Sequence, residues 1–223
     1  NGVFGLPTNQ PTPDLRLVAQ DQHEGYGGQG TAYVAQNLRG WLANDRPDIV
    51  LLSIGINDIA AGQTGQPTSV QTALSNIVQI IVTNRPSTHV IVAQIIPYAT
   101  AYTSAIYEYN DYIRSTLVPA FAARGHRVTT VDQCSHFVTD PAGLSADKER
   151  YANGINHPDA RTYAKMAETW FAGIQAVLSG GPTVTLSAPA ATQEAGPGTV
   201  LAVTASSTPG AGASFTGNGA VGS

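Results

Sequence analysis

Residues 49–58 have the sequence IVLLSIGIND, and this stretch decides the expected fold. Its apolar part has the length and composition of a strand buried on both faces, which is typical of a parallel sheet. Ligands bind to open α/β sheets at the carboxyl ends of such strands. Asn57, just past the run, can donate N–H bonds to a negative oxygen, although Asn-Asp is also a common turn sequence. The stretch alone leaves both interpretations of Asn57 open.

The flanking sequence alternates between helix-like and strand-like patterns. Apolar residues recur at helical spacing over 31–43, 68–82 and 106–121, and strand-like runs occupy 49–54, 89–96 and 127–131. This order predicts a parallel sheet with covering helices. Residues 132–156 have little periodicity and are expected to form a wall of the active site, since long loops are usually functional.

A last helix is predicted to begin at Pro158, because proline suits the first helical position. Its apolar stripe, which includes Met166 and Trp170, is expected to lie in the core. Gly180-Gly181-Pro182 ends the pattern, and the runs 183–187 and 200–204 predict short antiparallel strands. We therefore divide the chain into an α/β domain at 1–179 and, at 180–223, a linker with the incomplete start of an immunoglobulin-like β-sandwich.

Composition excludes several classes of function. The net charge of −4 and the scatter of only 11 lysines and arginines over 223 residues argue against nucleic-acid binding. No apolar run is long enough for a transmembrane helix, and Cys134, the single cysteine, allows no internal disulfide. No His, Asp or Glu grouping has metal-ligand spacing. We expect a monomer without metal or cofactor that acts on a small-molecule or polysaccharide ester.

Two further motifs carry residue types suited to catalysis. A glycine-rich loop, His23 to Gly28, precedes the first helix, where exposed backbone N–H groups favour a negative oxygen. His157 precedes Pro158 after the long loop, and a histidine there can act as a general base, although an isolated His-Pro is more commonly a surface feature. With Asn57, these motifs make three candidate parts of one site.

In this combination and order, the chain resembles the SGNH hydrolases, also called GDSL esterases and lipases. The similarity covers roughly residues 1–179, and Ala93–Pro97 and Tyr163–Ala167 add to it. It implies a flavodoxin-like three-layer α/β/α sandwich with a parallel sheet. It also implies ester hydrolysis by a serine, with Gly28 and Asn57 in the oxyanion hole and His157 as general base.

The chain departs from the family pattern at two positions. The family's nucleophile lies in Gly-Asp-Ser after its first strand, and this tripeptide is absent here. We therefore expect a fragment cut at both ends, without the first strand and inactive alone; Ser53, inside a strand, is a poor substitute. The family's acid precedes the histidine by three residues, where Gly154 stands. Asn153 is a candidate to orient His157, and Asp140, Asp147 and Glu149 are alternatives.

The His23-Glu24-Gly25 loop is most similar to that of acetyl esterases of carbohydrate esterase family three. The resemblance implies a secreted serine esterase that removes acetyl groups from plant polysaccharide. Two alternatives remain open: a non-catalytic carbohydrate-binding or display module on a degenerate fold, and a lipase or lysophospholipase of the same family. No signal peptide is visible, and the sequence leaves open whether the given chain is itself an enzyme.

Overall fold

The computed structural model describes residues 23–60, 67–99, 104–140 and 145–179, together with two short strands at 185–187 and 204–206. The chain separates into two compact units, Asn1–Ile174 and Gln175–Ser223. The first unit holds all three predicted motifs, and the description below concerns that unit unless stated otherwise.

A parallel three-stranded sheet forms the centre of the first unit. Its order is β1 (Ile49–Leu52), β2 (His89–Gln94), β3 (Val128–Asp132), so consecutive strands are neighbours. In register, Val50 lies opposite Val90, and Val92 lies opposite Thr130. Because all strands run the same way, their carboxyl ends lie at one edge, as predicted from the alternating pattern.

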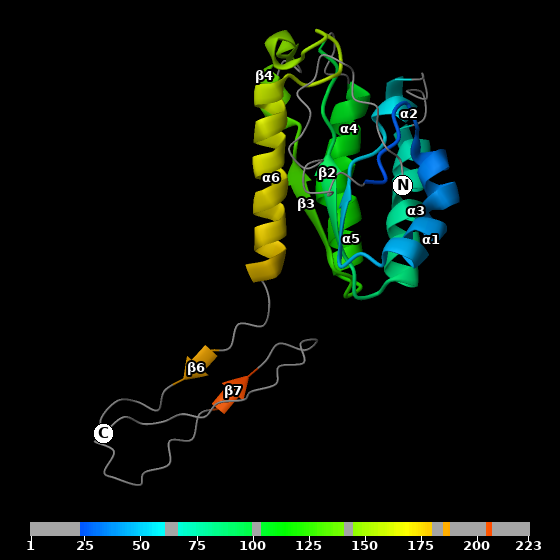
Figure 1. The fold of residues 1–223 in the computed structure, drawn as a ribbon, viewed down its shortest axis with the longest axis vertical. Helices are drawn as coiled ribbons and strands as arrows, with labels where there is room; N and C mark the ends of the chain where they lie inside the picture. The colour runs from blue at the N-terminus through cyan, green and yellow to red at the C-terminus, as the bar shows by residue number, and fades with distance from the viewer. Residues whose placement is uncertain are drawn as a thin grey trace, which may run out of the picture. The chain divides into compact units, whose positions relative to one another are not determined.

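Helices cover both faces of this sheet (Figure 1). Val90 and Val92 pack in one core with residues of α1 (Thr31–Asp45), α3 (Pro67–Asn84) and α4 (Ser104–Tyr112). On the other face, α6 (Ala160–Ser179) brings Gly173 against Val131 and Ile91, where an added Cβ would lie 2.7 Å from Val131 Cγ1. The first unit is therefore an α/β fold with a parallel three-stranded sheet between helices, as the family resemblance implies.

The predicted helix at 106–121 is present but irregular. It consists of α4, a π-helical turn η3 (Ile113–Leu117) and α5 (Val118–Ala122). Pro119 lies at the start of α5. Proline lacks an N–H and its ring clashes with the carbonyl four residues earlier, so a wider turn before it removes that conflict.

Two expectations for the segment after β3 need correction. Residues 132–156 contain the short elements η4 (Ser135–Phe137), β4 (Val138–Asp140), β5 (Ser145–Ala146) and η5 (Lys148–Arg150), rather than an irregular loop. The last helix begins at Ala160, not at Pro158. Asp159 caps it, since its Oδ1 accepts the Thr162 N–H at 2.7 Å, while Pro158 forms a β-bridge with Tyr151.

Helix α6 is less buried than its apolar stripe predicts. Thr162 is its one buried residue, Met166 and Trp170 are half-buried, and Phe171 is 59% exposed. The prediction that both residues lie in the core is confirmed only in part, because Met166 packs against the buried cluster of Ala99, Phe137 and Tyr151, whereas Trp170 is only partly buried. A helix stripe becomes core only where an element covers it, and the described sheet covers little of this one.

In the second unit, β6 (Thr185–Ser187) pairs antiparallel with β7 (Thr204–Ser206). The predicted strand at 183–187 is thus confirmed over 185–187, whereas the other strand lies at 204–206 rather than 200–204. The immunoglobulin-like module stays a prediction, because most of 180–223 lies outside the described residues.

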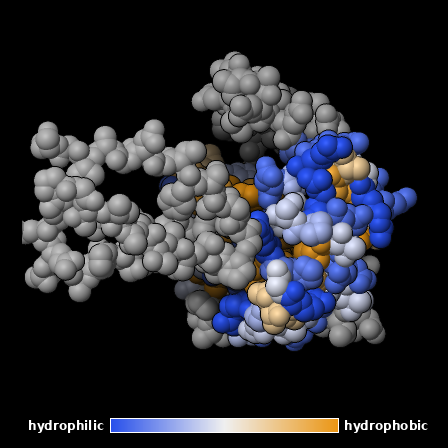
Figure 2. All heavy atoms as spheres, turned by 90° about the horizontal axis from the view of Figure 1, so that it is seen from below, coloured by the Kyte–Doolittle hydropathy of each residue, from blue (hydrophilic) through white to orange (hydrophobic). Residues whose placement is uncertain are grey.

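Viewed from below in Figure 2, the described residues are mostly hydrophilic, and apolar residues show between them. None of the described helices combines the length and hydrophobicity that crossing a membrane requires.

Candidate active site

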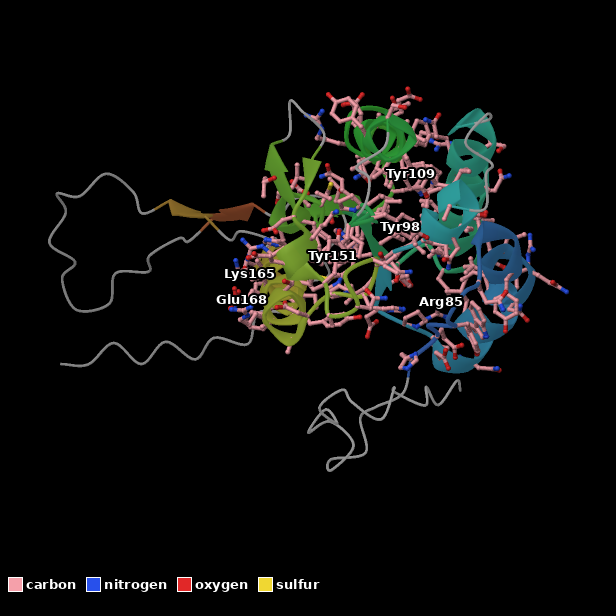
Figure 3. All side chains as sticks on the ribbon, turned by 90° about the horizontal axis from the view of Figure 1, so that it is seen from above. Arg85, Tyr98, Tyr109, Tyr151, Lys165 and Glu168 are labelled. Carbon is pink, nitrogen blue, oxygen red and sulfur yellow. The ribbon has the colours of Figure 1, made fainter. Side chains whose placement is uncertain are left out.

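Two side chains of α4 fix the carboxyl ends of β1 and β2. The buried Tyr109 hydroxyl donates to Ile54 O at 2.9 Å, and burial raises the pKa of this hydroxyl far above its ordinary value. The buried Asn110 amide pairs with the backbone of Ile95, donating to its O at 2.9 Å and accepting its N–H at 2.7 Å. Figure 3 looks onto this edge and shows Tyr109 in the interior, whereas Lys165 and Glu168 extend outward from α6.

Asn57 lies in the first turn of the short helix α2 (Ile56–Ala60), which follows β1. Its Nδ2 donates to Gln29 O at 2.9 Å. A carboxamide has two N–H donors, so this bond fixes the side chain and leaves a second N–H without a partner among the described residues. The bond to Gln29 O thus anchors the Asn57 side chain and leaves one N–H that can donate to another group.

The loop that contains Gly28 lies next to Asn57. Gly28 has φ +76°, a conformation that glycine adopts without strain, and Gln29 N–H closes the turn on Tyr26 O at 3.3 Å. The Tyr26 ring stacks on Trp41 of α1, with 5.3 Å between ring centroids. The structure therefore brings the Gly28 loop and Asn57 together through Gln29.

Asp58 provides a second connection between these segments. Its buried carboxylate, 8% exposed, accepts the Thr31 N–H at 3.1 Å and 3.0 Å and the Thr31 hydroxyl at 2.7 Å. Gly30, the N-cap residue of α1, provides no side-chain cap. Asp58 therefore caps α1 from a position 27 residues away in the sequence.

His157 is exposed in the loop that leads to α6. This loop is attached to the segment after β2, because Ala99 N–H donates to Ile155 O at 2.6 Å and the Tyr151 hydroxyl donates to Pro97 O at 2.6 Å. Since β2 neighbours β1, the loop lies at the same sheet edge as Asn57. No contact among the described residues joins the His157 ring to Asn57 or Gly28.

Two of the residues considered as partners of His157, Asn153 and Asp147, have other contacts. Asn153 Oδ1 accepts the backbone N–H groups of Ile155, Asn156 and His157, each at 3.0 Å. It therefore shapes the loop backbone, and none of its described contacts is to the imidazole. Asp147 pairs with Arg150 at 2.9 Å and accepts the Glu149 N–H.

A trough runs along the outer edge of β1. It has a volume of about 480 Å³, and its lining includes Leu38 and Trp41 of α1 and Trp170 of α6. Within the described residues, β1 pairs with β2 alone, and Leu51 is 44% exposed. His23, Ser53 and Asn57 also line the trough, so it opens at the candidate site.

Substitution of Gly55 tests how tightly this edge is packed. Gly55 has φ +116°, and an added Cβ would lie 2.6 Å from the Tyr109 hydroxyl oxygen. We expect Gly55→Ala to lower the free energy of unfolding by about 2–4 kcal/mol, from backbone strain and overpacking. Urea denaturation followed by circular dichroism measures the loss.

Gly40→Ala is the matched control. Gly40 lies inside α1 with nothing within 4 Å of an added Cβ. This substitution should stabilise the protein by about 0.5–1 kcal/mol, because alanine favours the helix. Equal effects of the two substitutions would contradict the packing described for Gly55.

Sequence reasoning named Gly28, Asn57, His157 and Asn153 but missed Asp58 and Tyr109. Asp58 stands beside Asn57 in the sequence, but its burial is apparent only in the structure. A buried carboxylate needs donors, and these come from Thr31, whose proximity is set by the fold.

Searches against known proteins place the chain in a family. The model of the GDSL-like Lipase/Acylhydrolase family matches residues 8–165. A family 3 carbohydrate esterase of Clostridium thermocellum has 28% sequence identity and a TM-score of 0.57, with 72% of this chain and 73% of that chain covered. No curated protein sequence matches the chain.

Two further solved structures share the fold. A carbohydrate esterase family 3 protein from Talaromyces cellulolyticus has 21% identity and a TM-score of 0.58, covering 72% of this chain and 73% of that one. A mutant acetyl esterase, solved with an acetate ion, has 21% identity and a TM-score of 0.63, with 80% of each chain covered. From the extent of the family match, the chain belongs to the GDSL-like lipase/acylhydrolase, or SGNH, family.

Proposed function

We propose that the chain is part of a serine esterase that removes acetyl groups from plant polysaccharide. The observation that carries this proposal is the pairing of the Gly28 loop with Asn57, joined by the bond from Asn57 Nδ2 to Gln29 O, at the carboxyl end of β1. In this proposal, the Gly28 backbone N–H and the second Asn57 side-chain N–H donate to the carbonyl oxygen as it gains charge. The 28% identity to a carbohydrate esterase supports the substrate class.

The reaction follows from these roles. A serine Oγ attacks the acetyl carbonyl carbon while His157 takes the serine proton, and the resulting oxyanion accepts N–H bonds from Gly28 and Asn57. His157 then gives the proton to the sugar oxygen as the acetyl–sugar bond breaks. A water molecule then gives a proton to His157 and attacks the carbonyl carbon of the acetyl-serine. His157 returns this proton to the serine Oγ as the acetyl–serine bond breaks, which releases acetic acid and restores the serine.

The trough beside β1 supports a particular source for the serine. A strand added there would pair with the outer edge of β1, and it would be buried between α1 and α6, so it should be apolar on both faces. If it ran parallel to β1, its carboxyl end would arrive beside Asn57. We propose that a Gly-Asp-Ser segment at that end provides the nucleophile, and that the chain without it lacks esterase activity.

Acyl-chain preference tests the substrate class. In the serine-containing form, kcat/KM for p-nitrophenyl esters should be highest for acetate and fall with longer acyl chains, and acetate should be released from acetylated xylan. A maximum at eight or more carbons would favour the lipase alternative. Binding of xylan without hydrolysis of any ester would favour the carbohydrate-binding module.

Secretion, supported by the low charge and the predicted β-rich tail, remains part of the proposal.

A further inference from the structure

We infer that Asp58 is a positioning residue that fixes the Gly28 N–H relative to Asn57; this inference rests on the proposed function. Asp58 touches no reacting atom in the mechanism above. Its buried carboxylate is instead bonded to Thr31, three residues after Gly28. Its effect on the reaction would pass through the loop that ends at Thr31.

Two sets of hydrogen bonds join residues 57–58 to residues 29–31. Asn57 Nδ2 holds Gln29 O, and Asp58 holds both the N–H and the hydroxyl of Thr31. Gly28 immediately precedes the residues held in this way. The segment Asn57-Asp58 thus carries one proposed oxyanion donor, Asn57, and holds in place the residues next to the other, Gly28.

Gly30 makes the close approach of these segments possible. An added Cβ at Gly30 would lie 2.7 Å from Asp58 Oδ1 and 3.0 Å from Oδ2. Its φ of −107° is open to any residue, so the requirement for glycine comes from the space that the carboxylate occupies. The sequence thus leaves room at Gly30 for a carboxylate from another segment.

The other contacts described for the Gly28 loop are made by residues before Gly28 or by Gln29. They include the turn from Gln29 to Tyr26, the bond from Tyr26 to Glu24, the bond from Gly25 to His23, and the contacts of the Tyr26 ring with Tyr33 and Trp41. A displacement of about 1 Å at a donor can cost on the order of 100-fold in rate, so the anchor after Gly28 matters for catalysis.

The first experiment uses the chain as given and needs no activity. Asp58→Asn replaces one acceptor oxygen by an amide that faces the donors of Thr31. In ¹H–¹⁵N spectra, we expect the Gly28 backbone amide and the Asn57 side-chain amide to shift or broaden. Asp111→Asn, on the surface of α4 where Asp111 accepts bonds from Arg114 and Ser115, should leave both signals unchanged.

The inference would be overturned if Asp58→Asn moved only the amide signals of the first turn of α1 and left those of Gly28 and Asn57 unchanged. Asp58 would then be a helix cap only. If Asp58→Asn fails to fold, Thr31→Val and Thr31→Ser replace it. Thr31→Val removes only the hydroxyl bond and should move the same two signals, whereas Thr31→Ser keeps the hydroxyl and should not.

The second experiment measures kinetics in the serine-containing form. Asp58→Asn should lower kcat about 10-fold to 100-fold with KM within about twofold. In an Asn57→Ala background its effect on kcat should shrink to within about threefold, while its effect on the urea midpoint persists. An undiminished kcat effect in that background would contradict the inference. Absence of esterase activity in the unsubstituted serine-containing form would refute the proposed function. The ¹H–¹⁵N spectra would still decide whether Asp58 positions the Gly28 loop.

Discussion

Asn57→Ala should lower kcat for p-nitrophenyl acetate about 100-fold to 1000-fold in the serine-containing enzyme, with little change in KM. The substitution removes the N–H that would contact the oxygen only after it has gained charge, so transition-state binding falls more than substrate binding. The loss of the bond to Gln29 O also loosens the neighbouring loop. Steady-state kinetics over a range of substrate concentrations separate the two parameters.

Asn84→Ala is the matched control for this change. Asn84 Nδ2 also donates to a backbone oxygen, that of Ile80 at 2.8 Å, but it lies at the exposed end of α3. Its loss should leave kcat within about twofold, because surface substitutions away from a site have small effects. A fall in KM and kcat together, or equal effects of the two substitutions, would contradict the oxyanion role of Asn57.

His157→Ala should lower kcat about 10⁴-fold or more, because the serine would lose the base that takes its proton. The fold should be unaffected. His157 is exposed, and the described bonds of this residue, from Ala152 N–H to its O and from its N–H to Asn153, involve its backbone. Kinetics with the same substrate, together with an unchanged circular dichroism spectrum, measure the effect.

His136→Ala controls for the loss of a histidine. His136 follows β3, and its Nε2 lies 2.7 Å from Thr169 Oγ1 of α6, so its contact is with the scaffold. This variant should retain kcat within about threefold. A loss comparable to that of His157→Ala would assign the base to His136, or to neither residue, and would remove His157 from the mechanism.

The sequence predicted the features of the fold that depend on local pattern. The apolar runs at 49–54 and 89–96 correspond to β1 and β2, and their alternation with helices predicted a parallel sheet. Because parallel strands end together, the position of Asn57 at the carboxyl edge followed from the same pattern. The pairing of the Gly28 loop with Asn57 needed the family resemblance as well.

The features that the sequence missed depend on distant neighbours. Pro158 was placed in the helix because proline suits its first turn, but Asp159 supplies the cap and Pro158 pairs with Tyr151. Trp170 was assigned to the core by its stripe, yet its burial depends on what lies beside β1. The bond between Asp58 and Thr31 spans 27 residues and has no local signal.

The central claim is that this chain provides an oxyanion hole and a base but needs a serine from a strand beside β1. Hydrolysis of p-nitrophenyl acetate tests this claim most directly. It should be measured for residues 1–223 and for a form in which an apolar strand ending in Gly-Asp-Ser precedes residue 1. We expect background hydrolysis from the first and His157-dependent turnover from the second. Turnover by residues 1–223 alone that is abolished by His157→Ala would contradict the account.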